Sequence, residues 1–319
     1  MSLTSIALRP HVHPRRALFA PDGSRFSIAD DTRLVLYDRD GTQITETALT
    51  DKRPFVFGLS WSPDGVHIAL AENDALRLRR ASDLSIVAER TRFGRGPLAF
   101  VGSSRIALAS WSELCVVEVP SLATLGSVTL ERDTYESFDI THVVADPSGT
   151  FVAGADYGGY SEDEWGHTAA RGIPKVTIVD AAAPSVEAHS LSQMQPVSEL
   201  EIDPWRKRLV VVTYKDVVVR DFSTAQVAVW TAYAKASIKA IAVCERYVVT
   251  MPDAINSRID LSLDFWDPVT YKHQRRERFL AGADRTPLLS MRPWWLSPSP
   301  DGSRLVVHEP DGVRVLAID

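Results

Sequence analysis

Ser62-Pro63-Asp64-Gly65-Val66-His67-Ile68 is one of three copies of the short pattern that decides the fold. The other two copies are Ala20-Pro21-Asp22-Gly23-Ser24-Arg25-Phe26 and Ser299-Pro300-Asp301-Gly302-Ser303-Arg304-Leu305. Proline presets the backbone at the first central position of a tight turn, aspartate hydrogen-bonds its own backbone, and glycine tolerates a positive φ. Short β-branched or alternating runs flank each turn, so every copy predicts a β-hairpin.

Weaker versions of the turn lie between these copies, at 146–149 and 203–206, with a degenerate one at 101–106. The first two copies open at Ala20 and Ser62, which are 42 residues apart. Seven units of about 46 residues would account for the whole chain, close to the roughly 40–45 residues of a four-stranded propeller blade. The repeat therefore overrides the two domains that the length alone would suggest.

A third strand is predicted after each hairpin, and a polar turn and a fourth strand usually follow. The predicted third strands are 33–37, 75–79, 114–119, 175–179, 217–220, 261–266 and 313–318. Since no segment carries a sustained apolar stripe of helical period, helices should be nearly absent.

The sequence predicts an all-β, seven-bladed β-propeller of four-stranded antiparallel blades, forming a single domain over 1–319. Its ring would be closed by the N-terminal strand, 4–8, joining the last blade, which leaves only short, protected sheet edges. The predicted blades are 15–50, 55–92, 96–132, 138–192, 195–234, 236–284 and 287–319.

These residues resemble the WD-repeat-like β-propeller superfamily over essentially the whole chain. Besides the Ser-Pro-Asp-Gly turn, the predicted third strand of blade six ends in a WD-like dipeptide, Trp266-Asp267. No blade carries the Gly-His pair of the strict family, so the comparison implies that its buried His–Asp hydrogen-bond network is missing here. Members are mostly rigid platforms for protein or peptide partners, although related propellers include hydrolases, lyases and redox enzymes. The fold therefore does not settle the function.

Composition narrows the functional classes. A net charge of −6 argues against nonspecific nucleic-acid binding, which needs many cations against phosphates. No run of 18 apolar residues exists for a membrane span, and residues 1–16 lack the apolar core of a secretory signal. Cys115 and Cys244 lie in apolar stretches and are predicted to be buried free thiols in a reducing compartment. We therefore expect a cytoplasmic protein.

Candidate binding residues gather in the loops that a propeller places on one face. Exposed aromatics among charges are common anchors of protein interfaces, whereas the same rings could simply plug the space between blades. The aromatics predicted on this face are Trp111, Tyr157, Tyr160, Trp165 and Tyr214, with Phe93, Tyr135, Tyr233 and Trp294 nearby.

The largest departure from the repeat is an insertion at 155–174 in blade four. Unstructured loops of this length are usually functional or disordered. The insertion has three consecutive carboxylates, Glu162, Asp163 and Glu164. We interpret it as an acidic, aromatic arm for a partner with basic residues; the alternative is a solvated insertion. Arg92 and Arg95, in an inter-blade loop, would give the face a charge dipole that orients a partner.

Catalytic and metal-binding motifs are mostly absent from the sequence. Acidic loops at 30–31, 72–74 and 308–311 could supply oxygen ligands to Ca²⁺. The positions expected near the channel mouth argue mildly against catalysis, because they offer one carboxylate and one imidazole beside two cations. These positions are Arg16, Gly58, Gly96, His142, Glu199, Lys239 and Trp295.

The favoured interpretation is a non-catalytic, cofactor-free interaction scaffold that binds a protein or peptide, with no bound metal. Two alternatives stay open. One is a propeller-type lactonase, lyase or hydrolase with its site at the channel mouth. The other is carbohydrate binding through Trp111, Trp165 and Trp294, since aromatic rings stack on sugars as well as on peptides.

Overall fold

The structure is a computed structural model, and it divides the chain into two compact units. Unit 1 comprises Met1–Arg53 and Trp205–Asp319, and unit 2 comprises Pro54–Pro204. The residues that the structure describes are 5–8, 14–49, 55–93, 96–110, 113–129, 140–149, 151–156, 159–162, 168–171, 175–180, 189–192, 197–213, 216–224, 226–233, 238–252, 262–278, 295–309 and 312–318. All regular elements in these ranges are strands, as the lack of helical periodicity predicted.

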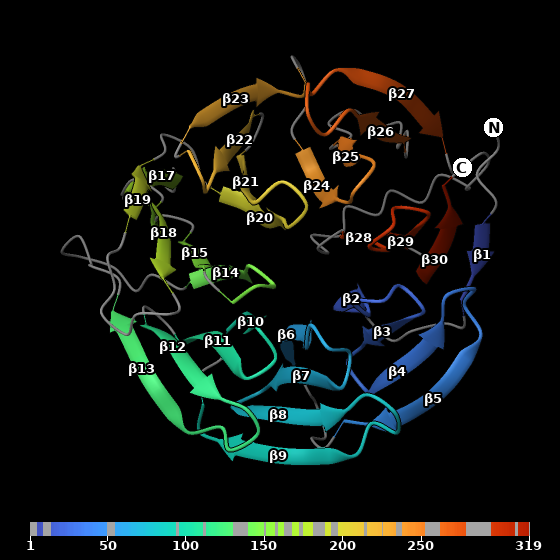
Figure 1. Ribbon diagram of the computed structural model, residues 1–319, viewed down its shortest axis with the longest axis vertical. Helices are drawn as coiled ribbons and strands as arrows, with labels where there is room; N and C mark the ends of the chain where they lie inside the picture. The colour runs from blue at the N-terminus through green and yellow to red at the C-terminus, as the bar shows by residue number, and fades with distance from the viewer. Residues whose placement is uncertain are drawn as a thin grey trace. The chain divides into compact units, whose positions relative to one another are not determined.

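Three four-stranded antiparallel sheets, here called blades, lie entirely in unit 1 (Figure 1). Blade one contains β2 (Arg16–Phe19), β3 (Arg25–Ala29), β4 (Arg33–Asp38) and β5 (Gln43–Ala48). Blade six contains β24 (Ile238–Val243), β25 (Val248–Pro252), β26 (Ser262–Trp266) and β27 (His273–Arg278). The last blade contains β28 (Leu296–Pro298), β29 (Arg304–Glu309), β30 (Gly312–Ala317) and β1 (Ser5–Ala7), with Ser5 opposite Leu316.

Unit 2 likewise holds three complete blades. Blade two contains β6 (Val56–Trp61), β7 (His67–Glu72), β8 (Ala75–Arg80) and β9 (Ile86–Thr91). Blade three contains β10 (Leu98–Val101), β11 (Arg105–Ser110), β12 (Glu113–Glu118) and β13 (Thr124–Thr129). Blade four contains β14 (Ile140–Ala145), β15 (Phe151–Asp156), β18 (Lys175–Asp180) and β19 (His189–Ser192).

The expected ring of seven blades needs correction, although the N-terminal strand joins the last blade as predicted. The compact units contain six complete blades, three in each. The unit boundary divides the remaining sheet, which consists of β20 (Val197–Asp203), β21 (Arg208–Thr213), β22 (Asp216–Asp221) and β23 (Val227–Thr231). The reason is packing: β20 lies against β14 and β15 in unit 2, whereas β21 lies against β24 in unit 1. The repeated hairpin pattern predicts local turns, but it does not predict how the sheets divide between the two compact units.

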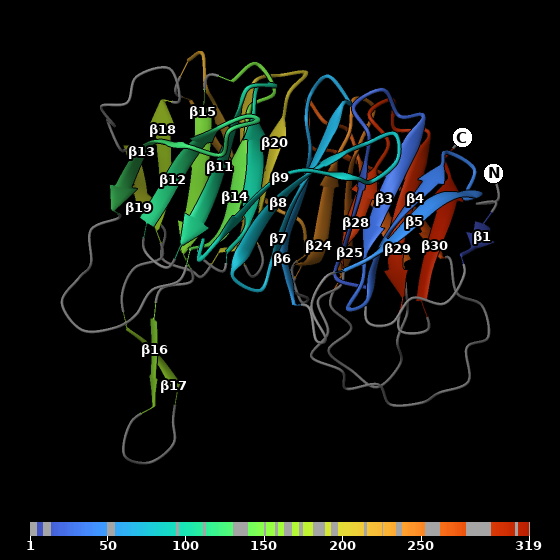
Figure 2. The same cartoon turned by 90° about the horizontal axis from the view of Figure 1, so that it is seen from below.

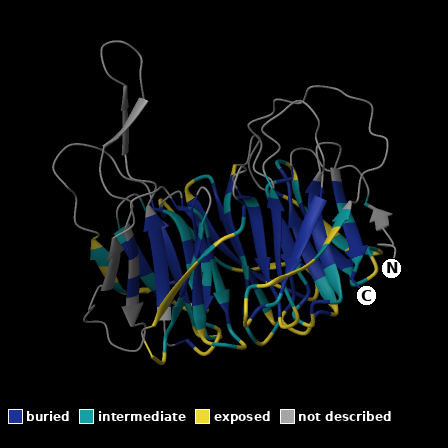
Figure 3. Ribbon diagram, turned by 90° about the horizontal axis from the view of Figure 1, so that it is seen from above, coloured by how far each residue is buried: buried dark blue, intermediate teal, exposed yellow. Residues whose placement is uncertain are grey.

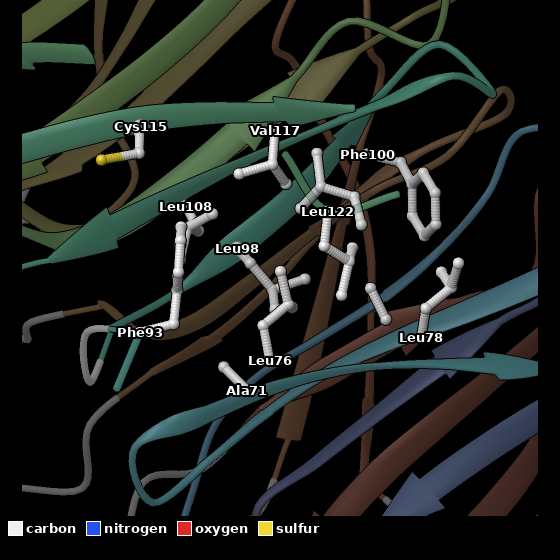
Figure 4. Close-up of a cluster of buried hydrophobic side chains, with 12 residues drawn as sticks. Ala71, Leu76, Leu78, Phe93, Leu98, Phe100, Leu108, Cys115, Val117 and Leu122 are labelled. Atoms are coloured by element: carbon white, nitrogen blue, oxygen red, sulfur yellow. The ribbon is translucent and has the colours of Figure 1, made fainter. Parts of the chain in front are cut away.

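The core lies between neighbouring sheets. Blades two and three share an apolar cluster in which Leu76 and Leu78 of β8 meet Leu98, Phe100 and side chains of β11 and β12 (Figure 4). Burial falls toward the fourth strand of a blade: β3 is almost wholly buried, whereas β5 alternates between intermediate and exposed residues (Figure 3). This gradient explains the sequence pattern, since strands covered on both faces are continuous apolar runs and half-covered strands alternate.

The repeated turn has the predicted chemistry and one further feature. In blade two, Gly65 has a φ of +71°, and Asp64 accepts the backbone N–H of Val66 at 3.0 Å. Ser62 donates its hydroxyl to Asp64 at 2.6 Å and accepts the backbone N–H of His67 at 2.8 Å. The serine at the head of the turn therefore links the aspartate to the following strand, a role that the sequence analysis did not assign.

Candidate functional site

Each blade presents two different ends. In an antiparallel sheet the connections between strands one and two and between strands three and four lie at one end, called the turn end here. The connection between strands two and three and the exit to the next sheet lie at the other, called the loop end. Asp64 lies at the turn end of blade two, and Asn73 lies at its loop end. Of the predicted binding residues that the structure describes, Arg92 lies in an exit connection, and Tyr160 and Glu162 lie between the second and third strands of blade four.

Three of the ten predicted partner-binding residues fall within the described ranges: Tyr160 and Glu162 in a strand of the blade-four insertion, and Arg92 between β9 and β10. The positions that lie outside the described residues are Arg95, Trp111, Tyr157, Asp163, Glu164, Trp165 and Tyr214. Tyr135 and Trp294, which were expected nearby, also lie outside them.

The insertion contains a ribbon of two antiparallel strands, β16 (Gly159–Glu162) and β17 (Thr168–Arg171). Tyr160 pairs with Ala170 and Glu162 with Thr168. Within the described chain, this sheet has no third strand, and Figure 2 shows it as a ribbon apart from β15 and β18. These two strands are not among those predicted from the sequence. Tyrosine and threonine favour strands, but four-residue strands are too short for a clear periodic signal.

Arg92 is exposed and has a positive φ of 57°. Its neighbours serve the core instead. Phe93 is buried, and the guanidinium carbon of Arg90 lies 4.1 Å from the centre of the Phe93 ring. Arg90 also donates to the carbonyl of Leu122 in the next blade at 2.8 Å. Of the aromatics expected near the binding face, Phe93 therefore belongs to the packing between blades.

Tyr233 is a second correction to that aromatic set, because its side chain is buried in a hydrogen-bond network of blade six. The indole N–H of Trp266 donates to the hydroxyl of Thr250 at 2.8 Å, and that hydroxyl lies 2.7 Å from the Tyr233 hydroxyl. Tyr233 donates to Oδ2 of Asp264 at 2.7 Å. Because Tyr233 gives its one hydroxyl proton to Asp264, the Thr250 hydroxyl, which accepts from Trp266, donates to Tyr233.

Asp264 is the acceptor at the end of this chain of donors, and its side chain is 0% exposed. His273 Nε2 lies 2.8 Å from Oδ1, and Arg276 donates Nε and Nη2 to the two carboxylate oxygens at 2.8 Å each. Burial acts to raise the pKa of Asp264, but the hydrogen bonds from Arg276, Tyr233 and His273 outweigh it and lower that pKa below the ordinary value. Burial also raises the pKa of Tyr233, so its hydroxyl keeps its proton.

This network differs from the His–Asp network expected to be missing, because its donor from the preceding connection is Tyr233 and not the histidine of a Gly-His pair. Tyr233 lies in the connection between β23 and β24, Thr250 lies opposite Asp264 in the ladder, and Asp264 lies opposite Arg276. The arrangement therefore joins three strands of blade six to the preceding connection. The signal that could have revealed it is an aspartate in the otherwise apolar segment Ser262–Trp266, because a buried carboxylate needs partners.

Two of the acidic loops considered for Ca²⁺ already have partners within the chain. Glu72 is fully buried and forms an ion pair with Arg77. Asp30 is fully buried and accepts the backbone N–H groups of Thr32 and Arg33 at 2.7 and 2.9 Å, which orders the turn between β3 and β4. These carboxylates are structural, and no group of three or more potential metal ligands occurs within the described ranges.

The positions expected at a channel mouth include two glycines that packing explains. A Cβ atom on Gly58 would lie 2.9 Å from the backbone nitrogen of Leu98, and one on Gly96 would clash with the carbonyl of Ala109. Glycine is needed there because backbones approach closely. His142, another of these positions, is half-buried, and its Nδ1 lies 2.8 Å from the Thr141 hydroxyl.

Both cysteines are free and buried, as predicted. Burial, with a smaller contribution from Glu113, raises the pKa of Cys115 to about 11. Such a thiol is protonated at neutral pH and unreactive. Among the described residues, the structure contains no helix with the length and apolar character needed to cross a bilayer.

Comparison with solved structures identifies the fold. The chain is similar to the crystal structure of the β-propeller domain of Cps50 (Swd1) from Myceliophteria thermophila, with a TM-score of 0.74. The similarity covers 100% of this chain and 99% of that chain at 13% sequence identity, so it establishes the fold alone. No family model and no curated protein sequence matches the chain. The protein is thus an all-β protein with a β-propeller fold.

Proposed function

We propose that this β-propeller is a non-catalytic interaction scaffold that binds a protein or peptide partner at the loop end of blade four. The observation that carries the proposal is the β16–β17 ribbon, because it is a structured extension where the other described connections between second and third strands are short. A connection of this kind on a rigid sheet framework is a common place for recognition residues.

Two further features support the same proposal. Tyr160 and Glu162 are both on β16, so an aromatic anchor and a carboxylate belong to the same short strand. The deeply buried polar groups described above, Asp264, Glu72 and Asp30, are engaged in ordering blades and turns. Their engagement favours a rigid platform over a reactive site. A cytoplasmic location belongs to this proposal and is supported by two free, buried thiols.

The test is crosslinking and affinity purification from cells of the native organism, with three forms of the full chain. The first is wild type, and the second replaces residues 158–172 with Gly-Ser-Gly-Ser, which removes the ribbon. The third, Trp205→Ala, is a matched control that removes an aromatic side chain of 39% exposure from a turn end. We expect partners recovered with wild type to fall at least tenfold in the ribbon deletion and to persist in Trp205→Ala. Equal recovery from all three forms would refute the proposed site.

A further inference from the structure

We propose that the partner supplies an extended segment rich in lysine or arginine, which pairs as a third strand with the edge of β16 that no described strand covers. This inference rests on the proposed function and names the class of partner that the same site would bind. It follows from the hydrogen-bonding pattern of the ribbon, the difference between its two edges and its charge.

The ribbon is smaller than any of the four-stranded blades. β16 and β17 have four residues each, and the two-stranded sheet that they form is hydrogen-bonded to no other described strand. An isolated two-stranded hairpin is marginally stable at best in water, and a third strand is among the usual ways to stabilise one. The ribbon therefore gains more from an added strand than the four-stranded blades do.

The strand edges of the ribbon differ from the outer edge of a blade. Each strand of a two-stranded sheet has one row of backbone N–H and C=O groups without a neighbour, which is a template for another chain. Elsewhere, the outer strand β27 carries Arg275, Arg276 and Glu277, charges of the kind that protect an edge. By contrast, β16 has Gly159, Tyr160 and Ser161 before its one charged residue, so most of its edge lacks that protection.

The two edges of the ribbon differ in charge, and this selects β16. β17 ends in Arg171, which would repel a basic segment, whereas β16 ends in Glu162. Opposite charges on neighbouring strands stabilise a sheet, and like charges directly opposite destabilise it. Peptides that bind by strand addition gain affinity from main-chain hydrogen bonds and specificity from alternate side chains.

Negative charge is concentrated in the insertion that contains the ribbon. Residues 155–174 contain four carboxylates and one guanidinium, a formal charge of −3, whereas the whole chain has −6. Half of the net charge thus belongs to a segment of 20 residues. A field of one sign accelerates the approach of an oppositely charged partner and disfavours partners of the same sign. The charge therefore specifies a basic segment.

The experiment uses the full chain and synthetic 12-residue peptides with capped ends. The probe alternates lysine with valine or threonine. One control peptide has glutamate in place of every lysine, and a second is N-methylated on consecutive residues, which removes the N–H donors from both edges of the strand. Fluorescence anisotropy in 0.1 M salt measures the dissociation constant. Hydrogen–deuterium exchange followed by mass spectrometry measures protection of residues 159–162.

We expect the lysine probe to bind at least tenfold more tightly than either control peptide and to slow exchange across 159–162 at least tenfold. The variant Glu162→Lys should weaken binding of the probe at least fivefold. Glu245→Lys, which changes an exposed carboxylate at a turn end, is the matched control and should leave binding unchanged. Circular dichroism verifies that both variants are folded.

Three results would overturn the inference: unchanged exchange at 159–162, equal binding of the glutamate peptide, or equal binding of the N-methylated peptide. The last would mean attraction of charge without strand pairing. These failures differ from failure of the proposed function. If the native partner is lost with the ribbon but the lysine probe does not bind, the scaffold site stands and the basic third strand is wrong. If the ribbon deletion keeps the native partner, the site itself is wrong.

Discussion

Blade six and the β16–β17 ribbon use strand pairing in opposite ways. In blade six, three of the four strands are joined further by the side chains of Trp266, Thr250, Tyr233 and Arg276, which converge directly or in sequence on the buried carboxylate of Asp264. In the ribbon, two short strands pair only with each other within the described chain. The polar groups of the first are paired in a buried network, whereas no described strand covers either edge of the second.

The difference shows that this fold uses its buried polar groups to order the blades. A fully satisfied buried network orders one arrangement of strands, because each alternative arrangement would leave a buried donor or acceptor unpaired. An open ribbon specifies little by itself and gains its order from what binds to it. The following predictions test this contrast, beginning with the largest effect.

Removing the acceptor of blade six should have the largest effect on stability. Asp264→Ala leaves the Tyr233 hydroxyl, the Arg276 guanidinium and the His273 ring without their common acceptor. The Tyr233 hydroxyl is then buried without an acceptor, at a cost of about 1–3 kcal/mol of unfolding free energy, and loss of the charge-assisted hydrogen bonds from the half-exposed Arg276 and His273 adds about 1–2 kcal/mol. Urea denaturation measures the loss.

The matched control is Asp83→Ala, which removes an exposed carboxylate that accepts the backbone N–H of Ser85 at 3.0 Å. Its urea midpoint should shift much less than that of Asp264→Ala. Equal shifts in the two variants would show that the blade-six network contributes no more than an ordinary turn.

Gly302→Ala should have the next largest effect, because this glycine joins the last blade to blade six. Gly302 has a φ of +69°, and a Cβ there would lie 2.7 Å from Sγ of Cys244 in the turn between β24 and β25. The left-handed backbone costs about 1–2 kcal/mol for a residue with a Cβ. Overpacking of a tight contact adds about 1–3 kcal/mol, which thermal or urea unfolding would measure.

Gly65→Ala separates these two contributions. Gly65 has nearly the same φ, +71°, but a Cβ there meets nothing within 4 Å. It should therefore lose only the backbone contribution. Adding Cys244→Ala to Gly302→Ala should restore part of the loss; an unchanged loss in the double variant would contradict the contact with Cys244.

Lowering the pH should reduce the stability of blade six, because it protonates Asp264. The folded pKa of this carboxylate lies below its ordinary value, because the hydrogen bonds from Arg276, Tyr233 and His273 outweigh the effect of burial. Its contribution to stability is therefore complete above the unfolded pKa of about 3.9 and is lost as the pH falls through the folded pKa. Tyr233→Phe removes one of those donors, so the folded pKa should rise toward the unfolded pKa; the acid loss, which begins near the unfolded pKa in both forms, should then be smaller and end at a higher pH.

Urea midpoints between pH 3 and pH 7 measure this shift in wild type, Tyr233→Phe and the ribbon deletion. The ribbon deletion should retain the wild-type profile, since it leaves Asp264 and its donors in place. A Tyr233→Phe profile parallel to wild type at every pH would show that the tyrosine hydroxyl does not set the pKa of Asp264.

The sequence predicts the features that depend on residues close together in the chain. The third strand predicted at 75–79 forms as Ala75–Arg80, because the turns that precede and follow it are set by adjacent residues. The strand predicted at 175–179 forms as Lys175–Asp180. The buried network was missed for the opposite reason. Tyr233 and Asp264 are 31 residues apart, and nothing near Tyr233 in the sequence identifies its acceptor.

Two further differences have the same origin. Arg90 and Arg92 look alike in the sequence, yet Arg90 donates to Leu122, 32 residues away, while Arg92 is exposed. The division of β20–β23 between the compact units depends on which sheets pack together, and the turn repeat does not encode that. The candidate site was predicted only as an insertion, because its strand pairing is too short to detect from periodicity.

Removing the ribbon should have the smallest effect on stability and thereby complete the contrast. Replacing residues 158–172 with Gly-Ser-Gly-Ser removes β16 and β17 but no strand of a four-stranded blade, and within the described chain no ladder outside the ribbon loses a partner. Because lengthening or shortening a flexible connection changes loop-closure entropy slowly, the unfolding free energy should change by less than about 0.5 kcal/mol. Urea denaturation at the same pH as for Asp264→Ala makes the comparison direct. A loss approaching that of Asp264→Ala would mean that the ribbon packs on blade four and stabilises the fold, as the buried network of blade six does.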